Sequence, residues 1–103
     1  MSGRLAIPLY RSGELLAYCG RSVKREQDPM LAFPKDFKAD SVIFNADAVT
    51  GSVIQVTDDP LRVLVAHQHG ITNAVALLAL TANSFALLAT FMQEIGAEKA
   101  EWL

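Results

Sequence analysis

The chain has 103 residues, a formal net charge of -2, and a composition that is 51% hydrophobic and 19% charged. This length suits one domain, and the abundance of apolar residues argues against a disordered chain, because their burial can offset the entropy of ordering. The small net charge excludes a general attraction to nucleic acid. Any such binding must therefore come from a local group of basic residues.

A β-hairpin is predicted over residues 4–20. Residues 4–9 alternate moderately and contain Pro8, which suits an edge strand, and a turn at 11–13 is followed by the returning strand 14–20. Cys19 is the single cysteine, so it has no disulfide partner within the chain and is expected to be an ordinary strand residue. A lone cysteine, together with an N-terminus that has no signal-peptide pattern, predicts a cytoplasmic location.

Residues 21–51 have no clear period and are predicted to be an irregular but ordered excursion. Within it, SVIFN at 41–45 favours a short strand, and 47–51 favours a turn or short helix. The segment 52–56 is a strand candidate. A helix is expected after it, because Asp58-Asp59-Pro60 supplies capping carboxylates and a proline for the first helical position.

Four residues of that helix are predicted to form one face, and Gly70 is expected to end it. The four are Leu61, Leu64, Val65 and Gln68. A short apolar run at 73–80 then predicts a buried parallel strand. A membrane span over 74–92 is the alternative, but polar residues at 81–84 interrupt the run where a strand would turn into a helix.

The last helix is expected to be capped by Asn83 or Ser84. Its apolar stripe is Phe85, Leu88, Met92 and Ile95, extended by Leu87 and Phe91. The segment 96–103 is expected to be a tail that is polar until Trp102 and Leu103. The fold class is therefore α/β (or α+β): one domain over residues 1–103, with the hairpin joined to a β-α-β-α unit at 52–95 and a short mixed sheet.

Several segments, in order, match the pattern of one family. They are RLAIPLYRSGELLAYCGR (4–21), FPKDFKADSVIFNADAV (33–49), SVIQV (52–56) and HQHGITNAVALLAL (67–80). Together they resemble bacterial and plasmid DNA primases, in the part that enters and forms the first half of the Toprim domain. The resemblance spans residues 4–92. It implies a primase-like fold and identifies Arg21 with the arginine of the family's Gly-Arg pair.

The chain departs from that family at its chemical positions. Thr57-Asp58 stands where the family has Glu-Gly, Met30 follows Pro29 where primases have a lysine, and Ala39 stands at a second lysine position, beside Lys38. The family's Asp-x-Asp motif lies on a third Toprim strand, which is expected to be missing here. Phosphoryl transfer needs metal ions held by such carboxylates, so we expect no primase-type catalysis and no cofactor.

Asp58 and Asp59 are the remaining candidates for a magnesium site, because they follow a predicted parallel strand at its carboxyl end. The competing interpretation is that both carboxylates cap the next helix, and the lack of a third nearby carboxylate favours it. His67 and His69 point away from each other on a helix and are expected to be ordinary helix-end residues.

Basic residues gather in the first 38 positions, which hold seven of the nine and carry three more positive than negative charges. The candidate nucleic-acid contacts are Arg4, Arg21, Lys24, Arg25, Lys35 and Lys38. Tyr10, Tyr18 and Phe33 lie among them in the sequence, so charge and stacking together favour single-stranded nucleic acid. The alternative is a solvated charged face over core aromatics.

Three functions follow. The first is a non-catalytic primase-like binding module that contacts nucleic acid or a replication-type protein. The second is a magnesium-dependent phosphotransfer or nuclease enzyme that uses Asp58 and Asp59. The third is a structural or interaction protein without a nucleic-acid role. A homodimer, formed by sheet edges or by the last helices, is expected because the chain has more apolar surface than a small domain hides. We expect no membrane partner.

Overall fold

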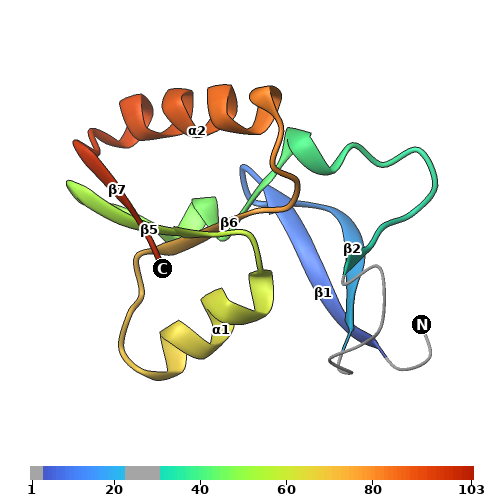
Figure 1. The fold of residues 1–103 in the computed structure, drawn as a ribbon. Helices are drawn as coiled ribbons and strands as arrows, with labels where there is room; N and C mark the ends of the chain where they lie inside the picture. Colours follow the sequence, from blue (N-terminus) through green and yellow to red (C-terminus); the bar gives the residue numbers. More distant parts are fainter. Residues whose placement is uncertain (1–3, 23–30) are drawn as a thin grey trace.

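The computed structural model describes residues 4–22 and 31–103. Two sheets and two α-helices make up this part of the chain (Figure 1). The elements are β1 (Arg4–Arg11), β2 (Glu14–Ser22), β3 (Leu31–Ala32), the 3₁₀ turn η1 (Ala39–Ser41), β4 (Ile43–Phe44), the 3₁₀ turn η2 (Ala46–Ala48), β5 (Val53–Thr57), α1 (Pro60–Gln68), β6 (Ala74–Leu77), α2 (Ala82–Ile95) and β7 (Lys99–Trp102).

The N-terminal sheet has the strand order β1-β2-β3, and its two long strands form the predicted hairpin. Ser12 and Gly13 both have positive φ, 51° and 79°, which is the backbone of a type I′ turn and matches the twist of the hairpin strands. Pro8 lies in β1 at the edge of this sheet, so its missing N–H interrupts no inner ladder. The prediction of an edge strand is confirmed.

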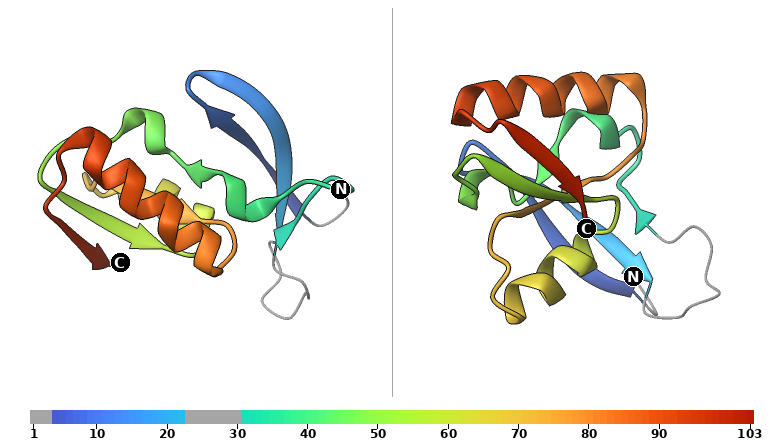
Figure 2. Two further views of the ribbon diagram at one scale, coloured as in Figure 1. Left: turned by 90° about the horizontal axis from the view of Figure 1, so that it is seen from above. Right: turned by 60° about the vertical axis from the view of Figure 1, so that its left-hand side comes forward.

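The second sheet has the order β4-β6-β5-β7, in which β6, β5 and β7 run parallel and β4 is antiparallel to β6. The helices cover opposite faces of this sheet, α2 above and α1 below in Figure 1, and the two views of Figure 2 show the same layers. Central β6 is buried at all four positions, as its apolar run predicts.

Three apolar clusters fill the spaces between these layers. The first lies between the sheet and α2 and includes Ile54, Val75 and Leu88. The second joins the hairpin to the second sheet, and it contains Cys19 and Leu78. The third, under α1, is formed by Val63, Ala66, Ala74 and Ala76. The mixed α/β class expected from the sequence is thus confirmed.

The buried face of α1 was predicted wrongly. Pro60, Val63 and Ala66 are its buried residues, whereas Leu64 and Val65 are 40% and 44% exposed. Apolar residues occur on both faces of this short helix, so hydropathy alone does not select the one that meets the sheet. Packing against the small side chains of β6 makes that selection. The predicted start is confirmed, because Pro60 is the first helical residue and Asp59 caps it.

Two further expectations about the last third are wrong. The cap of α2 is Thr81, whose hydroxyl accepts a hydrogen bond from the Ser84 N–H, and Ser84 itself is buried as the first inward residue. The polar tail forms strand β7, parallel to β5, so a strand does follow the last helix. None of the described helices combines the length and the hydropathy that crossing a membrane requires.

Candidate nucleic-acid interface

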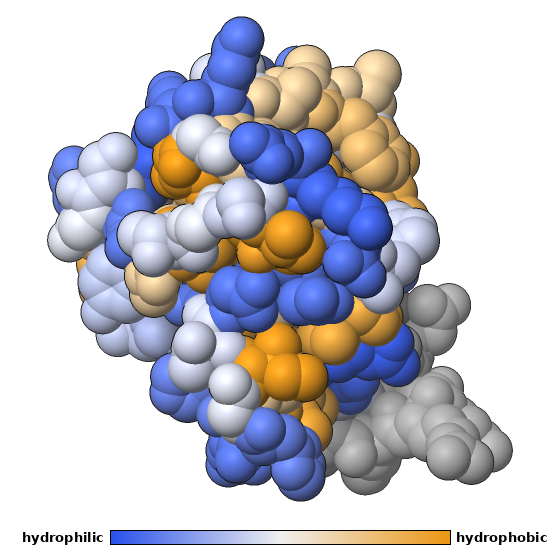
Figure 3. Space-filling view, turned by 90° about the vertical axis from the view of Figure 1, so that its left-hand side faces the viewer, coloured by the Kyte–Doolittle hydropathy of each residue, from blue (hydrophilic) through white to orange (hydrophobic). Residues whose placement is uncertain are grey.

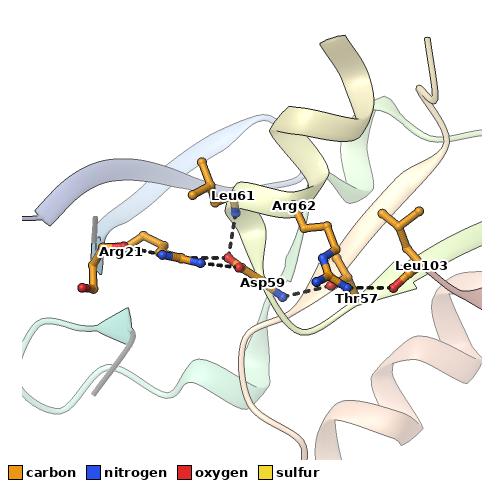
Figure 4. A network of polar contacts seen from close by, with 7 residues as sticks. Arg21, Thr57, Asp59, Leu61, Arg62 and Leu103 are labelled. Carbon is orange, nitrogen blue, oxygen red and sulfur yellow. Dashed lines mark hydrogen bonds and ion pairs between the residues drawn. The ribbon is translucent and has the colours of Figure 1, made fainter. Parts of the chain in front are cut away.

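Arg21 and Asp59 form a two-point ion pair that links the hairpin to the second sheet (Figure 4). Arg21 Nε donates to Asp59 Oδ1 at 3.1 Å, and Nη2 donates to Oδ2 at 2.6 Å. The remaining guanidinium nitrogen, Nη1, donates to the Ser22 carbonyl. Both side chains are largely shielded, with 15% and 16% of their surfaces exposed. The geometry is the paired fork in which arginine and carboxylate bind most strongly.

Local structure positions both partners of this pair. Arg21 stands near the end of β2, where it pairs with Leu31 of β3. Asp59 stands between β5 and α1: Oδ1 accepts from the Leu61 N–H at 3.0 Å, and the Asp59 N–H donates to Thr57 Oγ1 at 3.3 Å. Asp59 therefore caps α1 and receives the guanidinium with the same carboxylate. Sequence reasoning found the cap but missed the ion pair, because the two residues are 38 positions apart.

Electrostatics at this contact favour the charged forms of both groups. Burial raises the pKa of Asp59, but hydrogen bonds from Arg21 and Leu61 and the positive charges of Arg21 and Arg62 outweigh it, so the pKa is below its usual range. The hydrogen bond to Asp59 raises the pKa of Arg21, against a smaller opposite effect of burial. The pair is thus ionised at neutral pH.

The proposed magnesium ligands are placed differently from each other. Asp58 is exposed, whereas Asp59 is occupied by Arg21 and by its capping bond. Across residues 4–22 and 31–103, no group of three or more His, Cys, Asp or Glu side chains is arranged to hold a metal ion. The geometry around Asp59 therefore favours the capping interpretation.

The structure brings only some of the candidate basic residues together. Arg4 pairs with Ser22 across the hairpin, so Arg4 and Arg21 share its open end, where Arg4 Nη1 also donates to the Gly20 carbonyl at 3.3 Å. Lys35 and Lys38 are exposed and lie apart from them, on the segment between β3 and η1. Lys24 and Arg25 lie outside the described residues.

The aromatic side chains proposed for stacking fall into two groups. Tyr10 and Tyr18 are 48% and 50% exposed on the hairpin. Phe33 instead stacks on Phe37, with ring centroids 5.7 Å apart, and both pack against the apolar cluster of the hairpin. Lys35 lies in the turn that joins these two rings. The exposed tyrosines are available to bases, whereas Phe33 is mainly a packing residue.

A groove of 520 Å³ lies between the tip of the hairpin, the two 3₁₀ turns and α2. Asp47 fixes one end of it, because its Oδ2 accepts a hydrogen bond from the Gly13 N–H at 2.8 Å. The groove lining includes Tyr10, Arg11, Phe91 and Glu94. No sequence pattern indicated this groove, since its walls come from four separate segments.

Comparison with known proteins gives a match in structure only. No family model matches the chain, and no curated protein matches it. Among solved structures it resembles the zinc-binding and RNA polymerase domains of the Aquifex aeolicus primase, with a TM-score of 0.73, 24% identity, and coverage of 98% of this chain and 27% of that one. The RNA polymerase domain of Mycobacterium tuberculosis primase DnaG, in complex with double-stranded DNA, gives a TM-score of 0.73 at 22% identity. That match covers 96% of this chain and 35% of that one.

A DnaG primase catalytic domain bound to single-stranded DNA gives a TM-score of 0.69 at 21% identity, over 97% of this chain and 33% of that one. The chain therefore spans about a third of the solved structures that it matches. These likenesses show that the chain has the fold of one part of the primase catalytic core. The primase resemblance inferred from the sequence is confirmed at the level of fold.

Proposed function

We propose that the chain is a non-catalytic, primase-like module that binds single-stranded nucleic acid. The observation that carries the proposal is the primase fold, shared over nearly the whole chain with a domain that was solved bound to single-stranded DNA. A replication-type protein is the partner that a negative nucleic-acid result would favour. The basic and aromatic residues left exposed by the fold support nucleic acid as the first partner.

The exposed residues that support binding are Lys35 and Lys38, on the segment between β3 and η1, and Tyr10 and Tyr18, on the hairpin. Exposed lysines neutralise phosphates and release their counterions, and exposed tyrosines stack on bases with little dependence on sequence. Arg21 takes a different role in this proposal, because its donors already bind Asp59 and the Ser22 carbonyl. It positions the hairpin instead of contacting phosphate.

The non-catalytic character is supported by the state of the carboxylates. Both carboxylate oxygens of Asp59 accept hydrogen bonds from Arg21, and Oδ1 also accepts the capping bond of α1. Asp59 could bind a metal ion only if these bonds were broken. Asp58 is a single exposed carboxylate, and among residues 4–22 and 31–103 no group of three or more His, Cys, Asp or Glu side chains is arranged to hold a metal ion. A magnesium-dependent enzyme is therefore the weaker proposal.

The test is fluorescence anisotropy of labelled single- and double-stranded DNA, at low and moderate salt, with and without magnesium. We expect salt-sensitive binding to the single strand that does not require magnesium. Lys38→Ala should weaken it and lower the magnitude of the salt slope by about one. Arg62→Ala removes the same charge from α1, which carries none of these four residues, and serves as the matched control.

Three results would count against the proposal. Equal losses of DNA affinity in Lys38→Ala and Arg62→Ala would mean that binding depends only on the overall charge of the protein. Absence of binding to either DNA would shift the assignment to a protein partner. Binding or cleavage that appears only with magnesium, and disappears in Asp58→Asn, would instead support the enzyme.

A further inference from the structure

The groove beside α2 is shaped by contacts between segments that are distant in the sequence. The Gly13 N–H donates to Asp47 Oδ2 at 2.8 Å, which fixes the hairpin tip against η2. The left-hand view of Figure 2 shows the segment of η1, β4 and η2 between α2 and the hairpin. This segment therefore forms the floor of the groove, and α2 and the hairpin tip form its two walls.

The floor and the α2 wall of this groove are apolar. Leu87, Phe91 and Ile95 form one stripe along the wall, because residues four apart lie on the same face of a helix. The floor includes three buried side chains, Val42, Ile43 and Val49. On the side of the molecule that Figure 3 shows, by contrast, hydrophilic residues separate most of the apolar patches. The groove measures 520 Å³, which lies within the range of about 300–1,000 Å³ that is typical of ligand sites.

The dimensions of the groove match a helix that is embedded to half of its width. From Leu87 to Ile95 the α2 wall is about 12 Å long, at about 1.5 Å per residue. A helix with its side chains is about 10 Å wide, so about 12 Å of helix occupies about 940 Å³ and half of it about 470 Å³. The groove volume of 520 Å³ is close to this half. A helix of about two turns therefore fits along α2 with one face in the groove.

Charged side chains at the rim of the groove indicate which helix fits. Glu94 is exposed in the last turn of α2, where the negative end of the helix dipole also attracts cations. Asp47 is exposed beside the floor, and Arg11 lies on the hairpin wall. Among residues 4–22 and 31–103, none of these three side chains forms an ion pair. The rim is therefore negative along α2, and a helix lying there is complementary when the flank that faces α2 is basic.

Two hydroxyl groups of the lining already have partners within the chain. Ser41 Oγ donates to the Lys38 carbonyl at 2.6 Å, and Thr90 Oγ1 donates to the Ala86 carbonyl at 3.2 Å. These donors need no hydrogen-bond acceptor from a ligand, so an apolar helix face can cover them without leaving a donor unsatisfied. Apolar contact and the charges at the rim therefore determine what the groove binds.

We propose that this groove binds an amphipathic helix of a partner protein. The apolar face of that helix packs on the floor and on the apolar stripe of α2, and basic residues on its flank pair with Glu94. The apolar contact supplies most of the affinity, and the charges select the partner. The inference is independent of nucleic-acid binding, because Lys38, on which the DNA test depends, does not line the groove.

Synthetic peptides with one apolar pattern and different charges test the proposal by isothermal titration calorimetry. The acetylated and amidated peptide ALKALLKALKAALK has its leucines on one helical face and its lysines on one flank, and ALEALLEALEAALE carries glutamates instead. The basic peptide should bind with a micromolar Kd, and the acidic peptide should bind about tenfold more weakly. Absence of binding by the basic peptide overturns the proposal, and so do equal affinities for the two peptides.

A third peptide tests the conformation of the bound segment. In ALKALLKPLKAALK a proline interrupts the helix and leaves the leucines and lysines in place. It should bind about tenfold more weakly than the basic peptide. Equal affinity would mean that the groove takes an extended segment, which overturns the assignment of a helix.

Reversing one charge at the rim tests the pairing with Glu94. Glu94→Lys should weaken binding of the basic peptide about tenfold and strengthen binding of the acidic peptide. Glu101→Lys is the matched control, because it makes the same change at an exposed residue of β7, on the opposite edge of the sheet from β4. Equal effects of the two variants would show that the peptides respond only to net charge, which overturns the pairing.

Filling the groove tests its location. Thr90 is exposed and lines the groove, so Thr90→Trp places a large side chain in it and should weaken binding of the basic peptide at least about tenfold. Ala89→Trp is the matched control, because Ala89 is exposed on the same helix but does not line the groove. Circular dichroism and thermal unfolding establish that both variants are folded. A folded Thr90→Trp variant that binds the peptide as tightly as Ala89→Trp overturns the proposal.

Discussion

The Arg21–Asp59 pair gives the sharpest prediction about stability, because one contact joins two sheets. Asp59→Asn retains a residue that caps helices well but removes the charge that Arg21 binds. Asp58→Asn is the matched control, since it makes the same chemical change one residue earlier, at an exposed carboxylate. Arg21→Ala removes the other partner of the pair.

The expected size follows from the burial of the two side chains. Exposed ion pairs contribute about 0–1 kcal/mol, and breaking a fully buried pair costs about 3–5 kcal/mol. With 15% and 16% of the side chains exposed and two hydrogen bonds formed, this pair lies between those limits. We expect Asp59→Asn to lower the free energy of unfolding by about 2 kcal/mol.

Urea unfolding measures this directly in the wild type, in the double variant Arg21→Ala/Asp59→Asn and in the single variants Arg21→Ala, Asp59→Asn and Asp58→Asn. The double-mutant cycle should give a coupling free energy of about 1–2 kcal/mol, because the two side chains bind each other and not common neighbours. Equal midpoints for Asp59→Asn and Asp58→Asn would refute the reasoning. A coupling energy close to zero would show that the contact does not stabilise the fold.

Acid unfolding examines the same contact through its charge. The pKa of Asp59 is lower in the folded state than the value of about 3.9 for an unperturbed aspartate. The stability that the pair provides is therefore complete above the unfolded pKa and is lost as the pH falls through the folded pKa. Below about pH 5 the wild type should lose stability more steeply than Asp59→Asn, and parallel curves would contradict this assignment.

Three smaller predictions concern single contacts. Thr81→Ala removes the cap of α2 and should lower the free energy of unfolding by about 1 kcal/mol, whereas Asn83→Ala, within the same turn, should have little effect in thermal unfolding. The Cys19 thiol is fully buried and its pKa is raised by burial, so a disulfide reagent should label it only after urea unfolding; rapid labelling of the folded protein would contradict that packing. Asp47→Ala should lower stability by about 0.5–1 kcal/mol and shift the Gly13 amide resonance, because it removes the acceptor of that N–H.

Local patterns in the sequence were sufficient to predict the elements that depend on a few neighbouring residues. The hairpin turn, the cap at Asp59 and the apolar run of β6 each combine a turn or capping residue with the right period. Strand β7 gave no such signal, because all four of its residues are exposed and its pairing with β5 depends on backbone bonds. Hydropathy does not record backbone bonds.

The candidate site was harder to predict than the fold. Arg21 was singled out through the family resemblance, but the carboxylate that binds it lies 38 residues away, across two sheets. Asp59 was expected to cap α1 or, with Asp58, to bind magnesium, and nothing in its local sequence indicated the ion pair with Arg21. Contacts between distant segments depend on how the two sheets pack, and that packing is made by the cluster that contains Cys19, Val42 and Leu78.

The central position of β6 determines when its amide protons can exchange with solvent. Its neighbours β4 and β5 hold it from both sides, one antiparallel and one parallel, and all four of its residues are buried. Its amide protons should therefore exchange with deuterium only when the whole domain unfolds. Those of β7, whose four residues are exposed, should exchange earlier. The ratio of these two rates would then separate local opening of β7 from unfolding of the whole domain, residue by residue.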